Sequence, residues 1–184
     1  SYTVNVPYTE EKVANYTVQV PYTEQVEQQS VGVVVDSYLM TNQKNIWAAG
    51  DCAQYPDALF EKGFMAANWA HAQAQGLYVG KAMVGVEQPA FSHVSSYTSS
   101  GAGLVLSFIG DIRRSVADEM VIRGDESDYP KFGELFLKNR RVIGAILINR
   151  GNEIIPITRL ISQQSAAMHF IDTLKDSSSD LKEL

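Results

Sequence analysis

The segment formed by residues 45–53 limits what this chain can fold into more than any other stretch. Its apolar first half, around Ile46 and Trp47, predicts a short buried strand. The strand is predicted to end at a tight turn formed by Gly50 and Asp51. The glycine lets a ligand approach the backbone closely, and the aspartate carboxylate can accept hydrogen bonds from ligand hydroxyl groups. The segment therefore predicts a ligand site at the end of a buried strand, with a plain turn or helix cap as the alternative role for the carboxylate.

The neighbouring segments place this strand in an α/β arrangement. Residues 31–36 are rich in β-branched side chains and predict a second buried strand upstream. Residues 61–84 form the longest helical pattern of the chain, rich in alanine and free of proline, and Gly85 follows as the expected C-cap. We therefore expect an α/β arrangement here, in which the Gly50–Asp51 turn stands between a buried strand and a helix.

The second half of the chain changes to an antiparallel pattern, which begins after a serine-rich boundary at residues 92–100. Short apolar or alternating runs are separated there by turns that contain glycine or polar residues, as is typical of consecutive antiparallel strands. Four such strands are predicted, at residues 104–109, 120–123, 132–138 and 142–148.

Helices are predicted after the last of these strands. Residues 153–164 have an amphipathic pattern, and Pro156 is tolerated there because it falls in the first turn. A second helical piece follows at residues 166–174, and the polar tail, residues 176–184, is expected to fray. Residues 89–175 are thus predicted to be a second domain, made of a small antiparallel sheet with C-terminal helices, and the fold class of the chain is α+β.

The first 29 residues carry a tandem repeat. Residues 2–10 recur as residues 16–24 with eight of nine positions identical, at a period of 14 residues. Alternating Tyr and Val predict strands, and the prolines restrict these strands to a sheet edge or an extended arm. Residues 1–29 are therefore predicted to be a repeat arm, which is either a strand pair, an ill-ordered extension or an adhesive arm that adds strands to a partner.

Charge and composition argue against several function classes. The net charge of −6 argues against a nucleic-acid partner, because phosphate neutralisation requires clustered Lys and Arg. No apolar run reaches the roughly 18 residues of a membrane span. The N-terminus has no signal-peptide pattern, although the chain does not begin with Met, which leaves a removed leader open. We therefore expect a cytoplasmic protein with no membrane and no nucleic-acid partner.

The residues that most often bind metals or react are few. The single cysteine, Cys52, excludes a Cys-x-x-Cys redox pair within the chain and is expected to be a small packed residue. His71, His93 and His169 lack metal-ligand spacing, so no metal site is predicted. His71 lies on the alanine-rich helix and is expected to be a hydrogen-bonded packing residue. No residue has the pattern of a catalytic acid, base or nucleophile.

Residues 45–53, preceded by Thr41, resemble the second FAD-binding motif of pyridine-nucleotide-dependent flavoprotein reductases. In that family the aspartate of the motif binds the ribityl chain of FAD. The resemblance implies this role for Asp51, with Gly50 and Cys52 in the turn that approaches the cofactor. Residues 30–88 would then be the C-terminal segment of an FAD-binding domain.

The match continues into the helix. Residues 68–76 resemble the helix that follows this motif in the ferredoxin-reductase and apoptosis-inducing-factor branch of the family. Side chains at the positions of Asn68 and Trp69 lie near the flavin there, so the resemblance implies cofactor contacts for both. A tryptophan in such a helix is otherwise more often a core residue, which is the alternative for Trp69.

Segments of the second domain resemble the C-terminal domain of the same branch, which is called the interface or dimerisation domain. They include residues 108–111, 121–125 and 141–145. The resemblance covers about residues 30–165, and we do not extend it to residues 1–29. It implies that the Tyr97–Ser99 region borders the flavin ring from the interface side.

The chain also departs from the family pattern. A complete reductase of this type carries Gly-x-Gly-x-x-Gly twice, because the glycines let a pyrophosphate sit on a helix N-terminus. The nearest candidate here begins at Gly101 and has Leu106 in place of the third glycine. The family's Trp-Ser-Asp segment appears as residues 98–100, and its acidic–His pair as residues 67 and 68. The chain therefore holds the distal half of a flavin site, and we expect FAD to bind if the site is completed.

The resemblance implies the C-terminal portion of an FAD-dependent NAD(P)H oxidoreductase, which passes electrons from a nicotinamide cofactor through the flavin to an acceptor. Because half of the site is missing, whether this chain alone is an enzyme is left open. The alternative is a non-catalytic dimerisation or interaction module that has lost the nucleotide-binding half. Its partners would be a second copy of the chain or a complete reductase subunit.

Overall fold

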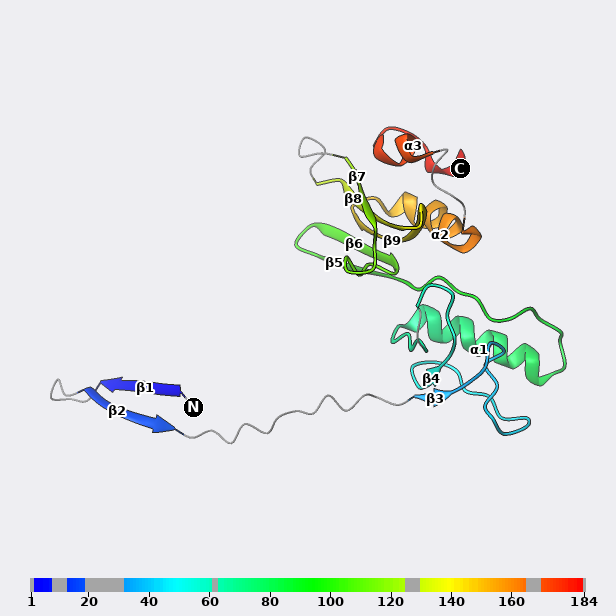
Figure 1. The fold of residues 1–184 in the computed structure, drawn as a ribbon, viewed down its shortest axis with the longest axis horizontal. Helices are drawn as coiled ribbons and strands as arrows, with labels where there is room; N and C mark the ends of the chain where they lie inside the picture. Colours follow the sequence, from blue (N-terminus) through cyan, green and yellow to red (C-terminus); the bar gives the residue numbers. More distant parts are fainter. Residues whose placement is uncertain are drawn as a thin grey trace. The chain divides into compact units, whose positions relative to one another are not determined.

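The computed structural model describes residues 2–7, 13–18, 32–60, 63–124, 130–164 and 170–183. The chain divides into two units, Ser1–Ser30 and Val31–Leu184. In the first unit, strands β1 (Tyr2–Pro7) and β2 (Val13–Val18) pair antiparallel (Figure 1). This is the strand-pair form of the repeat arm, although most of the second repeat lies outside the described residues. The adhesive role stays a prediction.

The second unit begins with a short parallel sheet and a helix. Strands β3 (Val33–Val34) and β4 (Ala53–Gln54) pair parallel, and helix α1 (Trp69–Met83) follows. A small core of buried residues joins these elements, and aromatic and aliphatic side chains from α1 and the flanking loops pack against it. The buried members are Val35, Leu39, Ala53 and Tyr55.

The predicted strand at residues 45–49 is wrong. Asn45 has φ +63°, and the Ile46 N–H donates to the Gln43 carbonyl, so the chain turns tightly instead of extending. Only an isolated bridge between Met40 and Trp47 remains of the expected pairing. The parallel partner of β3 is instead β4, which lies after the Gly50 turn. The predicted strand at residues 31–36 also shortens to two residues.

Helix α1 starts later than its alanine-rich pattern predicts. Asn68 is the N-cap, because its Oδ1 accepts the N–H of His71 at 2.9 Å. Residue 64 is held in an extended bridge to Tyr55, and residues 61 and 62 lie outside the described part of the chain. The predicted end is confirmed, since Gly85 follows the helix with φ +78°.

A five-stranded antiparallel sheet forms the rest of the unit, in the order β5-β6-β9-β8-β7. The four predicted strands are confirmed, and β5 was missed. Its serine- and threonine-rich sequence resembles a loop, yet it pairs with β6 along six residues as an exposed edge strand. The strands are β5 (Ser96–Gly101), β6 (Leu104–Gly110), β7 (Glu119–Arg123), β8 (Phe132–Lys138) and β9 (Arg141–Ile148).

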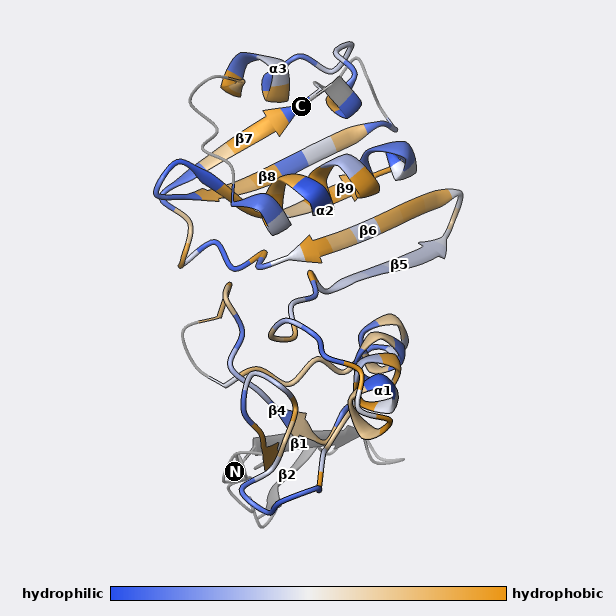
Figure 2. Ribbon diagram, turned by 90° about the vertical axis from the view of Figure 1, so that its right-hand side faces the viewer, coloured by the Kyte–Doolittle hydropathy of each residue, from blue (hydrophilic) through white to orange (hydrophobic). Residues whose placement is uncertain are grey.

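One face of this sheet carries the main core. A 3-10 turn, η2 (Gly151–Glu153), leads into helix α2 (Ile154–Gln163), which packs on β9 and β6 (Figure 2). Ile157, Leu160 and Ile161 are buried at helical spacing, and Pro156 sits in the first turn as predicted. The predicted amphipathic helix is therefore confirmed. Of the second predicted helical piece, residues 166–169 lie outside the described part of the chain, and α3 (Ile171–Lys175) follows them.

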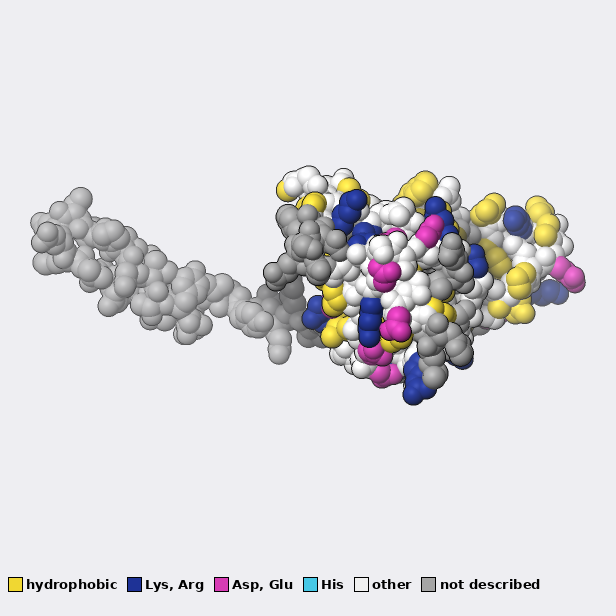
Figure 3. Space-filling view, turned by 90° about the horizontal axis from the view of Figure 1, so that it is seen from above, with side chains coloured by type: hydrophobic (Ala, Val, Ile, Leu, Met, Phe, Trp, Pro, Cys, Tyr) yellow, Lys and Arg dark blue, Asp and Glu magenta, His cyan; other side chains and the backbone are white. Residues whose placement is uncertain are grey.

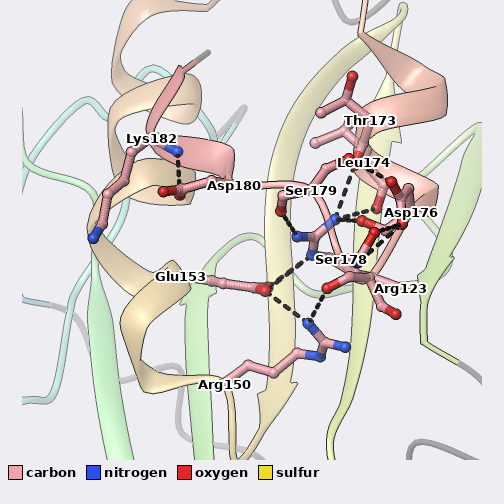
Figure 4. A network of polar contacts seen from close by, with 11 residues as sticks. Arg123, Arg150, Glu153, Thr173, Leu174, Asp176, Ser178, Ser179, Asp180 and Lys182 are labelled. Carbon is pink, nitrogen blue, oxygen red and sulfur yellow. Dashed lines mark hydrogen bonds and ion pairs between the residues drawn. The ribbon is translucent and has the colours of Figure 1, made fainter.

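The polar tail does not fray, because Arg123 at the end of β7 binds it. Arg123 is 1% exposed, and its Nε donates to both carboxylate oxygens of Glu153 at 3.0 Å. Arg150 donates to the same carboxylate at 2.7 Å (Figure 4). The tail ends in the 3-10 turn η4 (Leu181–Glu183), where Leu181 is buried. The other groups that accept from the Arg123 guanidinium are the backbone carbonyls of Thr173, Leu174, Asp176 and Ser179.

Surface charges of both signs are mixed. Lys and Arg side chains lie among Asp and Glu side chains on the face seen in Figure 3. Within the described residues, no helix combines the length and the apolar character that crossing a bilayer requires.

We predict that Arg123→Met lowers the free energy of unfolding by about 3–5 kcal/mol, because the substitution leaves a buried carboxylate and several carbonyl groups without their main donor. Urea unfolding followed by circular dichroism measures this change. Arg159→Met is the matched control, since Arg159 is exposed on α2, and it should change stability by less than about 0.5 kcal/mol. Equal losses in the two variants would contradict the structural role of Arg123.

Candidate functional site

The Gly50–Asp51 turn lies against helix α1. Gly50 has φ +85°, and its carbonyl accepts the N–H of Ala53 at 3.0 Å, which closes the turn. Its own N–H donates to Oε1 of Gln75 on α1 at 2.6 Å. Asp51 is exposed, and among the described residues its carboxylate has no recorded hydrogen bond. The turn therefore presents a carboxylate that is available to accept hydrogen bonds, and the role of an internal cap does not apply to it.

Two expectations for residues near this turn are wrong. Cys52 is exposed instead of packed, and its Sγ lies 3.6 Å from the Ala49 carbonyl oxygen. Trp69 is the first residue of α1 and is 77% exposed, so it is not a core residue. The helical spacing accounts for the exposure of Trp69, because His71 and Gln75, four residues apart, form the inward face of α1 and Trp69 lies off that face.

Asn68 connects α1 to the start of the antiparallel sheet. While its Oδ1 caps the helix, its Nδ2 donates to the Ser95 hydroxyl at 2.8 Å. Ser95 directly precedes β5. One side chain therefore fixes both the first turn of α1 and the approach of the chain to the sheet.

A pocket of about 400 Å³ lies between these two regions. Two stacked aromatic pairs contribute to its walls. The ring centroids of Phe60 and Phe64 lie 3.9 Å apart, with an angle of 1° between the ring planes. The centroids of Tyr97 and Phe108 lie 4.7 Å apart, with an angle of 19° between the planes. Asn68 lines the pocket between them. Such a pocket suits a flat, largely apolar ring.

The polar side of the pocket is electrically balanced. The Asp111 side chain is fully buried and accepts two hydrogen bonds from the Arg113 guanidinium, from Nε at 2.9 Å and from Nη2 at 2.6 Å. The Arg113 guanidinium also lies over the Phe60 ring, 5.2 Å from its centroid. This ion pair therefore clamps the loop after β6 onto the aromatic wall without adding net charge.

The structure brings some of the sequence-predicted residues together and separates others. Asn68 and Tyr97 line the same pocket, whereas Gly50, Asp51 and Cys52 form the turn beside the next turn of α1. Phe60, Phe64 and Phe108 were missed, because the first two lie between β4 and α1, the third lies on β6, and no sequence pattern links them. Ala72, against which Gly50 packs, lies one helical turn from Asn68, about 6 Å along the axis. The arrangement suits an elongated ligand with hydroxyl groups at the turn and a planar ring at the pocket.

Tyr55, Asp57 and His71 form a polar cluster at the buried face of α1. The Tyr55 hydroxyl donates to Asp57 at 2.8 Å and lies 2.9 Å from Nε2 of His71. Because Tyr55 has one proton and gives it to the carboxylate, His71 Nε2 carries the hydrogen. His71 is fully buried, which confirms the prediction of a hydrogen-bonded packing residue. Burial lowers the pKa of His71 to about 4, lowers that of the neighbouring His93 and raises that of Tyr55.

No group of three or more His, Cys, Asp or Glu side chains in the described part of the chain is arranged to hold a metal ion. The candidate site consists of the exposed Asp51 carboxylate, the start of α1 and the aromatic pocket, and it contains no such group among its described residues.

Two family models match the chain. The model described as pyridine nucleotide-disulphide oxidoreductase matches residues 15–76, and the model described as reductase C-terminal matches residues 101–184. The chain belongs to the pyridine nucleotide-disulphide oxidoreductase family. Members of this family are FAD-dependent. The matches extend on both sides beyond the limits of residues 30 and 165 that the sequence alone suggested.

Curated relatives are considerably longer than this chain. The monodehydroascorbate reductase of Pisum sativum is 30% identical over 130 residues, which are 67% of this chain and 29% of that protein. The 3-phenylpropionate/cinnamic acid dioxygenase ferredoxin–NAD(+) reductase component of Photorhabdus laumondii is 27% identical over 77% of this chain and 34% of its own length. The chain therefore spans about a third of the relatives that it matches.

Solved structures have the same fold. Putidaredoxin reductase, in its covalent complex with putidaredoxin, superposes with a TM-score of 0.71 at 22% identity, covering 83% of this chain and 35% of that one. A ferredoxin reductase from Rhodopseudomonas palustris gives a TM-score of 0.70 at 24% identity, and the match covers 83% of this chain and 36% of that one. The predicted α+β architecture of a reductase C-terminal region is thus confirmed.

We predict that stability falls as the pH drops from about 6.5 toward 4. Because the pKa of His71 is lower in the folded than in the unfolded chain, the unfolded state binds the extra proton over this range. His71 alone should remove up to about 3 kcal/mol, and His93, Asp57 and Tyr55 are the titratable groups that face it. Urea unfolding at several pH values measures the effect. His71→Phe should flatten this part of the profile, and an unchanged slope in that variant would contradict the assignment.

Proposed function

We propose that this chain is the flavin-facing C-terminal portion of an FAD-dependent NAD(P)H oxidoreductase, which passes electrons from a nicotinamide cofactor through the flavin to an acceptor. The carrying observation is that helix α1 is capped at Asn68, which lines the aromatic pocket, and contacts Gly50, next to the exposed Asp51, through Gln75. The family membership supports the reaction class. A cytoplasmic location stays part of the proposal.

The described residues fit one end of FAD. Asp51 would hold the ribityl hydroxyl groups, because its carboxylate is exposed and accepts no hydrogen bond from the residues that the structure describes. Gly50 would let the chain of the cofactor pass close to the backbone, since a Cβ built there meets only Ala72 at 3.7 Å. Tyr97 and Phe108 would form one wall beside the flavin ring.

The flavin supplies the redox chemistry when it is bound, and the protein orients and shields it. The first turn of α1 places the positive end of a helix dipole at the pocket, which favours electron density on a ring edge facing it. The neutral Arg113–Asp111 pair would keep the polar side of the pocket closed without attracting a competing anion. No described residue is assigned a proton-transfer role.

The non-catalytic interaction module is not favoured by the comparisons, because both family models describe reductase segments. A visible spectrum separates the two hypotheses. Flavin absorption bands that remain with the protein through gel filtration support the oxidoreductase. A colourless protein that takes up no added FAD and elutes as a dimer supports the module.

We predict that Asp51→Ala abolishes flavin binding and leaves the free energy of unfolding unchanged, because the exposed carboxylate makes no hydrogen bond or ion pair with the described residues. Titration with FAD, followed by flavin fluorescence, measures the affinity. Glu87→Ala removes another exposed carboxylate outside the turn and should bind FAD as the unchanged chain does. Full affinity in Asp51→Ala would show that the ribityl assignment is wrong.

We also predict that bound FAD quenches the fluorescence of Trp69, because this exposed ring lies next to Asn68 at the pocket. Trp69→Phe should remove most of the quenching. Trp47→Phe is the comparison, since Trp47 is half-buried three residues before Gly50, at the proposed ribityl end of the site instead of the ring end. If the two variants lose equal amounts of quenching, the flavin does not lie at the start of α1.

A further inference from the structure

Gln75 is a buried polar side chain that contacts the ligand turn. It lies two turns into α1 and is 1% exposed. Its Oε1 accepts the Gly50 N–H at 2.6 Å, across 25 residues of sequence. The amide orientation follows from chemistry, because a backbone N–H can only donate and the side-chain oxygen must therefore face it.

This orientation leaves the other half of the amide without a partner. Nε2 of Gln75 is buried and makes no hydrogen bond among the described residues. A buried donor without an acceptor destabilises a fold, and a methionine of similar length would not carry one. Packing alone thus favours an apolar residue at this position. What glutamine adds is the acceptor for Gly50.

Asp51 lies between two anchors. On its C-terminal side, the Cys52 carbonyl accepts the Val33 N–H at 2.7 Å, which ties the turn to β3. On its N-terminal side, Gln75 holds Gly50 against α1. Because Gly50 has φ +85° and no Cβ, its own backbone preference does little to fix the turn. The helix anchor therefore sets the direction in which Asp51 leaves the turn.

We infer that Gln75 is a positioning residue for ligand binding. It holds the Gly50–Asp51 turn against α1 so that the Asp51 carboxylate keeps one orientation toward ligand hydroxyl groups. Gln75 acts through the Gly50 backbone and does not itself touch the ligand, since it is buried. The inference rests on the proposed function, in which those hydroxyl groups belong to the ribityl chain of FAD.

Two variants of the full chain test this role. Gln75→Met keeps the length of the side chain and removes the acceptor. Gln75→Glu keeps an oxygen that accepts from Gly50 in either protonation state. Hydrogen exchange of the Gly50 amide, followed by NMR, should be about tenfold faster in Gln75→Met, as expected for the loss of one buried hydrogen bond, and close to the original rate in Gln75→Glu. Amides of β6 and β9 provide an internal control for folding.

Titration with FAD supplies the second measurement. Gln75→Met should bind FAD about tenfold more weakly, Gln75→Glu should recover most of the affinity, and the melting temperature of Gln75→Met should not fall. Weaker binding without lower stability separates positioning from a general structural role. Unchanged Gly50 exchange in Gln75→Met overturns the anchor, and faster exchange with unchanged FAD affinity overturns the positioning role.

The experiments distinguish a failure of the proposed flavin binding from a failure of the Gln75 anchor. If the unsubstituted chain takes up no FAD while Gly50 exchange responds to Gln75→Met, the anchor is present and the flavin assignment for this chain is wrong. If Gln75→Met also loses the protection of the β6 and β9 amides, Gln75→Glu decides the question alone. It must then retain both Gly50 protection and FAD affinity, and loss of either one in a folded Gln75→Glu overturns the inference.

Discussion

The candidate site depends on the amide of Asn68. Its oxygen caps α1 and its nitrogen binds Ser95 ahead of β5, so one planar group sets where the helix begins and where the sheet is entered. Residues four apart share a face of the helix, so His71 and Gln75 both point inward, toward Tyr55 and Gly50, while Trp69 is exposed. The cap at Asn68 and the buried face of α1 together hold the ligand turn, the pocket and the buried cluster on one helix.

Buried polar contacts join segments that are distant in the sequence. Gln75 meets Gly50 across 25 residues, Tyr55 meets His71 across 16, and Arg123 meets Glu153 across 30. Hydrophobic packing is not directional and would tolerate small shifts of each segment, whereas each of these contacts has a defined donor and acceptor. These contacts therefore select one relative position of the segments, although removing their polar groups from water costs free energy. Nε2 of Gln75 shows this cost most clearly, because it is buried and has no hydrogen-bond partner among the described residues.

Local patterns predicted the elements whose sequences carry a periodic signal. Helix α2 follows from its amphipathic spacing and from Pro156 in its first turn, and strands β6 to β9 follow from apolar runs between turns. The strand at residues 45–49 failed because a positive φ at Asn45 bends a segment whose composition favours extension. The ordered tail was missed because Arg123 binds carbonyls 50 or more residues away. Neither feature leaves a periodic signal in the sequence.

The shape of the site also determines which contacts supply the free energy of ligand binding. Parallel strands are normally covered on both faces, yet Val33 and Val34 are 46% and 66% exposed, so the strand beside the ligand turn is open. The sequence contains no Gly-x-Gly-x-x-Gly to hold a pyrophosphate. Flavin affinity in this chain would then come from ring stacking and from a few hydrogen bonds at one carboxylate. With so few contacts, each one carries a large share of the binding free energy. A residue that only orients Asp51 should therefore have a measurable effect on affinity, although a smaller one than Asp51 itself.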